Sequence, residues 1–239
     1  MMDSEKLSVR GVVLRTPERT VLDNVSIDVG TGSIVSVLGP NGAGKSELVL
    51  VISGMLPVTE GDVTISDTSL IGKPPEIVRK LGVASVPEGH QVLSRLSVDD
   101  NLRAAGSMHG TATLNSLVEE AYGVFPELVP LGRQSAGMLS GGQQQMVALA
   151  QAIVSRPRYL LVDEMSLGLA PIVIERLMKV LIALKEKGMG ILLIEQFTHL
   201  ALGISDYSYV LNGGKVVFSG LPKELNDNPE ILHQAYLSI

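Results

Sequence analysis

A glycine-rich segment between an apolar run and a helical run constrains the fold of this chain more than any other feature. Its residues are Gly39, Pro40, Asn41, Gly42, Ala43, Gly44, Lys45 and Ser46. The order matches the phosphate-binding pattern G-x-x-x-x-G-K-[ST] in full. The apolar run at residues 33–38 predicts a buried strand, and residues 45–55 have helical character. Because a strand leading into a helix is the context in which this motif binds phosphate, a purely structural glycine turn is the weaker interpretation.

The residue types of this segment suit the phosphates of a nucleotide. Glycines let the chain wrap around a phosphate with its N–H groups facing inward, while the helix presents its positive end. We expect Lys45 to reach the β- and γ-phosphates and the Ser46 hydroxyl to ligate Mg²⁺. Glu47 is unusual, because most such loops carry a small hydroxyl there. Its carboxylate either stabilises the helix N-terminus by about 0.3–1 kcal/mol or repels the nucleotide phosphates, and the sequence leaves both open.

Two adjacent acids, Asp163 and Glu164, end an apolar run that predicts a strand. Successive strand residues point to opposite faces, so the two carboxylates have different roles. We expect Asp163 to hold Mg²⁺ through water and Glu164 to polarise the water that attacks the γ-phosphate. On its own, an acid pair after a strand is more often a solvated turn. The complete phosphate loop earlier in the chain favours the catalytic interpretation.

A second candidate anion site stands between these two motifs. Its residues are Ser140, Gly141, Gly142 and Gln143. Two glycines after a serine, at the start of a predicted helix over residues 140–155, expose N–H donors and a hydroxyl together. In isolation the same pattern is equally typical of an ordinary helix N-cap.

Strand-like and helix-like runs alternate along most of the chain, which predicts an α/β fold. The expected strands are 25–29, 61–66, 83–86, 159–162 and 190–194, with an amphipathic helix at 171–186, a hairpin over 210–219 and a polar C-terminal helix. The pattern is helical from residue 97 to about residue 134. We therefore predict one domain over residues 1–239: a mixed sheet core, an N-terminal antiparallel layer, and a helical subdomain inserted at about residues 88–135.

Composition excludes several classes of protein. Hydrophobic residues make up 45% of the 239 positions and the mean hydropathy is +0.30. No apolar run approaches the roughly 20 residues that a membrane span needs. The net charge of −6 argues against a surface that coats nucleic acid. The absence of Cys removes disulfides and thiolate metal sites. Because Asp3 and Glu5 stand where a signal peptide needs basic and then apolar residues, we expect a cytoplasmic chain.

Taken together, the phosphate loop, the Leu-Ser-Gly-Gly-Gln sequence at 139–143 and the Asp163-Glu164 strand resemble the ATP-binding-cassette (ABC) ATPases over essentially the whole chain. Segments at 86–89, 166–171, 194–196 and 235–237 are similar to an ATPase subunit of bacterial branched-chain (hydrophobic) amino-acid importers. The resemblance implies a P-loop fold that binds ATP and Mg²⁺ and hydrolyses ATP to ADP and phosphate. Because cassettes of that family pair head to tail, it also implies that residues 140–143 contact the nucleotide held by the partner chain.

Some positions depart from the general pattern of that family. Glu88 stands where a Mg²⁺-contacting Gln is usual, and Gln196 stands where a switch His is usual. Both substitutions resemble those typical of the branched-chain subgroup. Gln196 can hydrogen-bond a γ-phosphate oxygen, but it supplies no positive charge. Met165 replaces a usual Pro and, like Glu47, fits no habit of the subgroup. We expect the four histidines to be surface residues: His90, His109, His199 and His233.

The leading hypothesis from the resemblance is an ATPase subunit on the inner face of the plasma membrane. Its partners would be a second cassette (a copy or a sister subunit), two transmembrane permease subunits and, indirectly, a periplasmic or extracellular solute-binding protein, with no nucleic acid. A groove floored by residues 88–102 would accept a short helix of a membrane subunit. The solute would be a branched-chain or hydrophobic amino acid, or a related amide such as urea. Two alternatives stay open: a soluble cassette ATPase without a transport role, and a degenerate cassette that binds nucleotide as a regulator.

The first half of the chain has no aromatic ring before Tyr122. Cassette ATPases usually stack the adenine on an aromatic ring ahead of the phosphate loop, and Thr16 stands at that position. Arg15 or Arg19 can stack through a guanidinium plane, which contributes only about 0.5–2 kcal/mol. We therefore expect weak discrimination between nucleotide bases.

Overall fold

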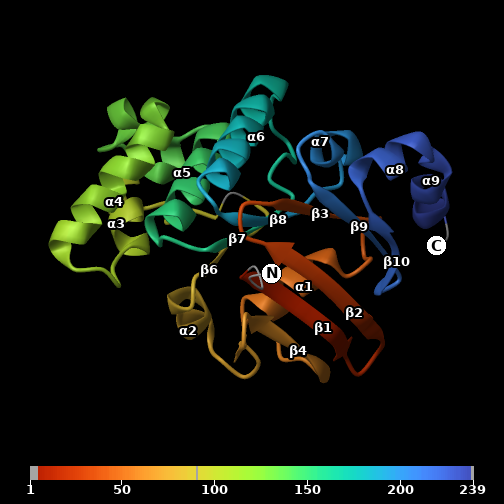
Figure 1. Cartoon of the computed structure of the whole chain (residues 1–239). Helices are drawn as coiled ribbons and strands as arrows, with labels where there is room; N and C mark the ends of the chain where they lie inside the picture. The colour runs from red at the N-terminus through yellow and green to blue at the C-terminus, as the bar shows by residue number, and fades with distance from the viewer. Residues whose placement is uncertain (1–4, 90, 238–239) are drawn as a thin grey trace.

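The computed structural model describes residues 5–89 and 91–237, and these form two β-sheets and a set of helices (Figure 1). The strands are β1 (Lys6–Arg15), β2 (Thr20–Gly30), β3 (Ile34–Leu38), β4 (Glu60–Ile65), β5 (Thr68–Ser69), β6 (Val83–Val86), β7 (Tyr159–Asp163), β8 (Gly190–Ile194), β9 (Tyr207–Asn212) and β10 (Lys215–Gly220). The α-helices are α1 (Lys45–Ile52), α2 (Pro75–Lys80), α3 (Val98–Ala105), α4 (Thr111–Val124), α5 (Gly141–Val154), α6 (Pro171–Glu186), α7 (Thr198–Leu202), α8 (Pro222–Asp227) and α9 (Pro229–Leu237). Two short 3₁₀ helices are η1 (Pro126–Leu131) and η2 (Ala136–Met138).

The larger sheet has six strands in the order β10-β9-β3-β8-β7-β6. Its strands pair in parallel from β9 to β6, and β10 pairs antiparallel with β9. β3, β7 and β8 are buried along their whole length. Continuous apolar runs suit such strands, because both faces of a central parallel sheet are covered.

Alternate residues of the central strands enter two different hydrophobic cores. Ile34 of β3 and Leu160 of β7 belong to the core shared with the helices α5 and α6. Their neighbours Val35 and Leu161 belong to the core shared with α1 and the antiparallel sheet. The period of two along each strand therefore places the sheet between a helical side and a mixed side.

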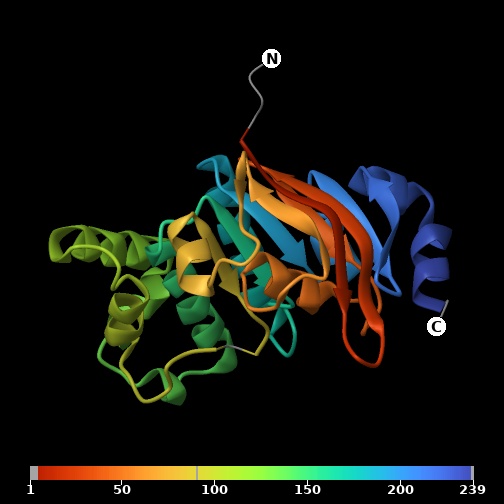
Figure 2. The same ribbon diagram turned by 90° about the horizontal axis from the view of Figure 1, so that it is seen from below.

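The N-terminal antiparallel sheet has the order β2-β1-β4-β5 and shares its core with α1 (Figure 2). This layer was expected from the sequence, but β1 was not, and β2 begins at Thr20 where residues 25–29 were expected. Register shifts along the β1–β2 pair interrupt the alternation of β1 between Val9 and Arg15. Such irregularities weaken the period-two pattern by which a strand is recognised.

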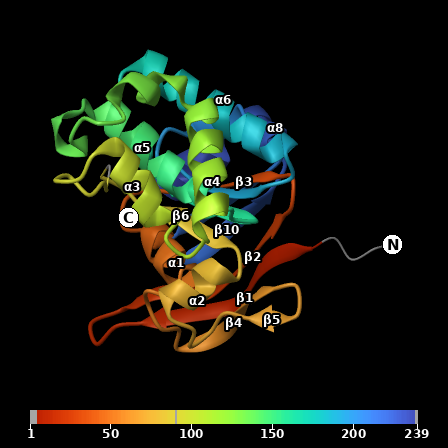
Figure 3. The same ribbon diagram turned by 90° about the vertical axis from the view of Figure 1, so that its left-hand side faces the viewer.

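Helices between β6 and β7 form a layer beside the large sheet (Figure 3). α3 and α4 pack against α5, and α5 also contacts β6. α5 thus joins the helical layer to the sheet, and a separate subdomain at residues 88–135 stays a prediction. Within residues 5–89 and 91–237, no helix has the length and apolar character needed to cross a membrane.

The α/β fold expected from the sequence is confirmed, as is the hairpin that turns at Asn212-Gly213-Gly214. The expected single C-terminal helix was wrong, since α8 and α9 are separate helices. Pro229 begins α9, and a proline cannot continue a preceding helix because it lacks the N–H and clashes with the turn before it.

Candidate active site

Three buried strands bring the candidate site together at one edge of the large sheet. β3 pairs in parallel with β8, and β8 with β7, so their carboxyl ends meet. The phosphate loop follows β3, Asp163 and Glu164 end β7, and Glu195 and Gln196 follow β8. Ligand sites of α/β sheets lie outside the carboxyl ends of the strands, and this edge has that position.

The phosphate loop turns sharply from β3 into α1 at positions that only glycine fits. Gly39 has a φ of +151°, and a Cβ there would lie 2.0 Å from the carbonyl oxygen of Leu211. Gly44 has a φ of +102°, and a Cβ there would lie 2.9 Å from the carbonyl oxygen of Val21. The loop is therefore pressed against the backbone of β9 and β2, which fixes its path.

Lys45 is buried inside this turn, although it carries a charge. Its side chain is 4% exposed, and its Nζ donates hydrogen bonds to the carbonyl oxygens of Gly39 at 2.9 Å and Pro40 at 3.1 Å. The same Nζ lies 3.5 Å from Oε1 of Glu164, which is 12% exposed. The lysine thus joins the phosphate loop to the acidic end of β7.

Asp163 is the most deeply buried acid of the expected site, at 4% exposure. Burial raises the pKa of its carboxyl group to about 6, with a smaller increase from the charges of Glu164 and Glu88 and a decrease from a hydrogen bond of Ser46. Among the described residues its Oδ1 has no hydrogen-bond partner. A buried carboxylate oxygen without a partner, beside the Ser46 hydroxyl, has the donor chemistry that Mg²⁺ prefers.

Glu164 has a left-handed backbone conformation, with a φ of +44°. A residue other than glycine adopts such a conformation at a cost of about 1–3 kcal/mol, which surrounding contacts must offset. Its N–H donates to the carbonyl oxygen of Ile194 at 2.9 Å, so the backbone of β8 holds the turn. Met165, the next residue, is buried in the core on the helical side of the sheet, where an apolar side chain belongs.

Sequence reasoning gave no role to Glu195, which the structure places beside this turn. Its carboxylate is 1% exposed and accepts two hydrogen bonds from Ser166, from the N–H at 3.2 Å and from the hydroxyl at 2.6 Å. Burial raises the pKa of Glu195 to about 6, and the charges of Glu164 and Asp163 add to the increase. An acid directly after an apolar strand was the one available signal in the sequence.

Two expected site residues lie at the exposed rim. Glu88 is exposed in the loop after β6, and its charge raises the pKa of Asp163. Gln196 is exposed directly after Glu195. Glu47 is half-buried in the first turn of α1, and both interpretations of its carboxylate stay predictions.

The expected surface histidines differ in exposure. His199 and His233 are exposed, whereas His109 is half-buried, and no described residue is a hydrogen-bond partner of its Nε2. His90 lies outside the described residues.

The second candidate anion site forms the N-terminus of α5. The hydroxyl of Ser140 accepts from the N–H of Gln143 at 3.3 Å, and Oε1 of Gln143 accepts from the N–H of Ser140 at 3.0 Å. This reciprocal pair is a capping box. Across residues 5–89 and 91–237, no hydrogen bond or ion pair joins residues 140–143 to the phosphate loop. The capping hydrogen bonds of this helix N-terminus therefore lie within residues 140–143, and none of them reaches the phosphate loop of the same chain.

The turn before β2 carries the residues expected near the nucleotide base. Thr16 closes the turn: its hydroxyl donates to the carbonyl oxygen of Arg19 at 3.1 Å and accepts from the N–H of Arg19 at 3.2 Å. The Arg15 guanidinium is paired with Glu60 at 2.6 Å. Arg19 is exposed and makes no side-chain hydrogen bond or ion pair within the described part of the chain. Of the two arginines, Arg19 is the one available to stack.

A tyrosine from the last helix touches the phosphate loop. The N–H of Gly39 donates to the hydroxyl of Tyr236 at 3.2 Å, and burial raises the pKa of that tyrosine. Sequence reasoning did not find this contact, because nothing in a C-terminal helix indicates which distant loop it meets.

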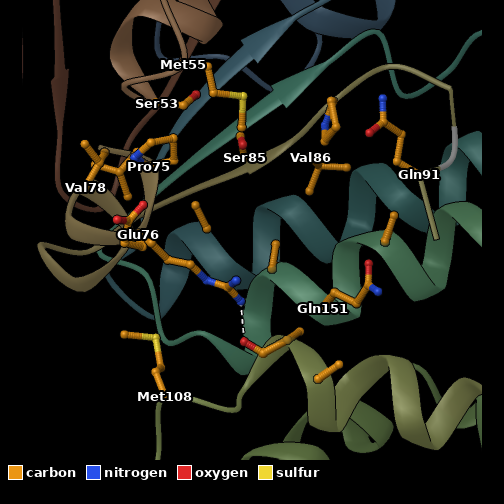
Figure 4. Close-up of a pocket in the computed structure, with 18 of the residues that line it drawn as sticks. Ser53, Met55, Pro75, Glu76, Val78, Ser85, Val86, Gln91, Met108 and Gln151 are labelled. Atoms are coloured by element: carbon orange, nitrogen blue, oxygen red, sulfur yellow. Dashed lines mark hydrogen bonds between the residues drawn. The ribbon is translucent and has the colours of Figure 1, made fainter. Parts of the chain in front are cut away.

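A groove of about 780 Å³ lies between the sheet and the helical layer. Figure 4 shows Met55, Val78 and Met108 along one side and Gln91 and Gln151 at the other. Arg79 bridges the walls, since its guanidinium donates to the carbonyl oxygen of Ala105, and burial lowers the pKa of this arginine.

The expected floor of the groove was only partly right. Of residues 88–102, Gln91, Val92 and Leu93 line it. Asn101 is fully buried, and its side-chain amide accepts from the N–H of Leu93 at 2.8 Å and donates to the carbonyl oxygen of Ser97 at 2.8 Å. These bonds connect Leu93 and Ser97 to α3.

Comparison with known proteins agrees with this geometry. The sequence profile of the ABC transporter family matches residues 22–166. The chain is 37% identical over 216 residues to the high-affinity branched-chain amino acid transport ATP-binding protein BraG of Pseudomonas aeruginosa, covering 90% of this chain and 92% of that protein. It is 37% identical over 212 residues to the probable branched-chain amino acid transport ATP-binding protein LivF of Archaeoglobus fulgidus, covering 87% and 89%. The crystal structure of an ATP-binding cassette of an ABC transporter in its ADP conformation has a TM-score of 0.84 at 28% identity, covering 96% and 97%.

Proposed function

Because this chain belongs to the ABC transporter family and is an ATP-hydrolysing transporter component, we propose that it powers the uptake of branched-chain or other hydrophobic amino acids through separate membrane subunits. The observation that carries the proposal is the sheet edge where Lys45, Asp163 and Glu164 meet. The relatives named for branched-chain amino acid transport support the choice of solute. The buried packing of Met165 removes one reason for treating the chain as a degenerate cassette.

Each residue at the sheet edge has a proposed task in hydrolysis. The loop amides at 39–46 and the Lys45 ammonium bind and orient the phosphates. Glu164 accepts a proton from the water whose oxygen bonds to the γ-phosphorus, while the bond from that phosphorus to ADP breaks. Ser46 and Asp163 would hold Mg²⁺, with Glu88 and Gln196 at the rim of the same site. The bound ion would neutralise charge on the phosphate oxygens.

A second cassette completes the site in this proposal. The N-terminus of α5, at residues 140–143, presents N–H donors and a hydroxyl but contacts nothing of its own phosphate loop. It would therefore contact the nucleotide held by the partner chain. Turnover per chain should fall steeply on dilution to monomers, measured by phosphate release alongside light scattering. Equal turnover of dilute monomer and assembled complex would contradict this arrangement.

The groove of Figure 4 is the proposed docking site for a short helix of a membrane subunit. Met55 and Met108, two exposed apolar side chains that line the groove, suit the nonpolar face of such a helix. Through this contact, a conformational change that accompanies ATP hydrolysis at the sheet edge would reach the membrane subunits. The solute itself would not touch this chain.

The decisive experiment isolates the complex that forms around this subunit and returns it to lipid vesicles. We expect membrane subunits to co-purify, and ATP-dependent uptake of radiolabelled leucine that a competing hydrophobic amino acid suppresses. ATP turnover without any membrane partner would favour a soluble ATPase. Uptake of urea but not leucine would keep the transport role and change the solute.

A further inference from the structure

The buried carboxylate of Glu195 connects two segments that flank the proposed site. Ser166 lies two residues after Glu164, and Glu195 lies one residue before Gln196. The two hydrogen bonds between Ser166 and Glu195, at 3.2 Å and 2.6 Å, therefore join the turn that carries the proposed base to the segment that carries the γ-phosphate contact.

The turn after Glu164 is also held by the buried packing of Met165 and by a hydrogen bond from the N–H of Leu169 to the carbonyl oxygen of Ser166 at 3.2 Å. Within it, the N–H of Leu167 reaches the carbonyl oxygen of Glu164 at 3.4 Å, which is a long hydrogen bond, and Gly168 has a φ of +74°. On the other side, Gln196 and Phe197 are exposed. The Ser166–Glu195 pair is buried at 2% and 1% exposure, so water does not compete for its hydrogen bonds.

The pair works together with one backbone contact. The N–H of Glu164 donates to the carbonyl oxygen of Ile194, directly before Glu195. The turn is thus fixed to the end of β8 at two successive points, once through the backbone and once through the carboxylate. Removing the carboxylate leaves the backbone contact with Ile194, and the segment after Glu164 can then shift relative to Gln196.

We propose that Glu195 is a positioning residue for ATP hydrolysis, which fixes Glu164 and Gln196 relative to each other through its two hydrogen bonds to Ser166. The proposal rests on the proposed function of the sheet edge. Glu195 touches neither nucleotide nor water in this role. It acts through its neighbours.

The role requires the shape of the side chain and not its charge. A glutamine can accept from the Ser166 N–H with its carbonyl oxygen and donate its amide to the Ser166 hydroxyl. Glu195→Gln should therefore keep the connection, whereas Glu195→Ala removes it. This difference separates positioning from proton chemistry, in which both variants would fail alike.

The test measures kcat, ATP affinity and thermal unfolding of the assembled complex for wild type and both variants. Misplacement of a reacting group by about 1 Å costs up to about 100-fold in rate, so we expect Glu195→Ala to lower kcat at least about 30-fold while the Kd for ATP changes less than about twofold. Glu195→Gln should stay within about threefold of wild type in kcat. Loss of ATP affinity in parallel with kcat, or equal damage from both variants, would overturn the proposal.

A second variant keeps the test independent of the folding of Glu195→Ala. Ser166→Ala removes the shorter hydrogen bond and keeps the N–H, so kcat should fall by a smaller factor, about 3- to 10-fold. The Ser166→Ala/Glu195→Ala double variant should be no slower than Glu195→Ala alone, because both remove one connection. Additive losses would contradict the pairing.

Ser36→Ala is the matched control for a structural effect. The hydroxyls of Ser36 and Ser208 share a buried hydrogen bond of 2.7 Å between β3 and β9 of the same sheet. Its loss should lower the unfolding temperature without lowering kcat below the transition. Wild type and Glu164→Gln are assayed alongside: an inactive wild-type complex overturns the proposed function and this role together, whereas an active wild type with full turnover in Glu195→Ala overturns this role alone.

Discussion

The two candidate nucleotide-contacting regions of this chain are built in opposite ways. At the sheet edge, charged groups from different strands and a helix are buried together, with Lys45 and Glu164 3.5 Å apart. At the N-terminus of α5, Ser140 and Gln143 satisfy each other in a capping box on the surface of the helical layer. One region depends on the whole sheet for its geometry, and the other on a single turn of helix.

The difference separates the effects of a substitution that arise within one chain from those that arise only in an assembly. A change at the sheet edge alters chemistry that a single chain already brings together. A change at the N-terminus of α5 alters a surface whose proposed ligand is held by another chain.

Glu164→Gln should greatly slow ATP hydrolysis at the sheet edge and leave ATP binding unchanged. A general base contributes about 100- to 10,000-fold to a rate, so turnover should fall at least about 100-fold. ATP should still bind, because the loop amides and Lys45 are unchanged. Phosphate release and equilibrium ATP binding on the assembled complex measure the two effects. Full turnover in this variant would remove Glu164 as the base.

Ser140→Ala should lower turnover of the assembled complex without changing ATP binding by the monomer, and so distinguish the α5 region from the sheet edge. The loss of an N-cap destabilises the chain by about 0.5–2 kcal/mol, and turnover of the assembled complex should fall about tenfold, with ATP affinity of the monomer unchanged. Ser97→Ala is the matched control, because Ser97 caps α3 by accepting from the N–H of Asp100 at 3.1 Å. It should lose similar stability and keep its turnover. Equal loss of turnover in both variants would mean that the α5 cap is only structural.

Acid should weaken Mg²⁺ binding at the proposed metal site of the sheet edge and leave the α5 region unaffected. The folded-state pKa of Asp163 is raised to about 6, so its carboxylate is ionised above that pH and takes up a proton as the pH falls through it. Because Mg²⁺ binds the ionised form, the affinity for Mg²⁺ in the presence of a non-hydrolysable ATP analogue should fall about fourfold from pH 7 to pH 5.5. Isothermal titration measures it. Asp163→Asn should bind Mg²⁺ more weakly and lose this part of the pH dependence; an unchanged pH profile would exclude Asp163.

The smallest effect is expected at the nucleotide base, outside both regions. Because Thr16 stands at the position expected for the aromatic ring, ATP and GTP should be hydrolysed with kcat/KM values within about threefold of each other. Arg19→Ala should weaken ATP binding about two- to fivefold, since exposed stacking contributes about 0.5–1 kcal/mol. Arg15→Ala, which breaks an exposed ion pair with Glu60, should leave affinity unchanged. A strong preference for ATP would show that another group recognises adenine.

Local patterns in the sequence were sufficient for the central strands and the phosphate loop. β6, α6 and β8 have the expected bounds, because continuous apolar runs and a first-turn proline are strong local signals. The pairing of Asp163 and Glu164 with the loop also followed, since the carboxyl ends of parallel strands meet at one edge.

Contacts between distant segments did not follow from the sequence. The register shifts of β1 erased its alternation, and the role of Asn101 in holding the residues before α3 depends on which carbonyl groups it meets. Ser166 and Glu195 are 29 residues apart in the sequence, and neither polar residue indicates by itself that the two form a hydrogen bond. Tertiary packing decides such contacts, and local residue types do not encode it.

The contact between Gly39 and Tyr236 has a consequence for protein synthesis. The two residues are 197 positions apart, so the phosphate loop can gain this hydrogen bond only after another 197 residues have been translated. At about 5–20 residues per second, this interval lasts roughly 10–40 s. A nascent chain therefore carries the complete phosphate-loop sequence well before that loop has its final partner.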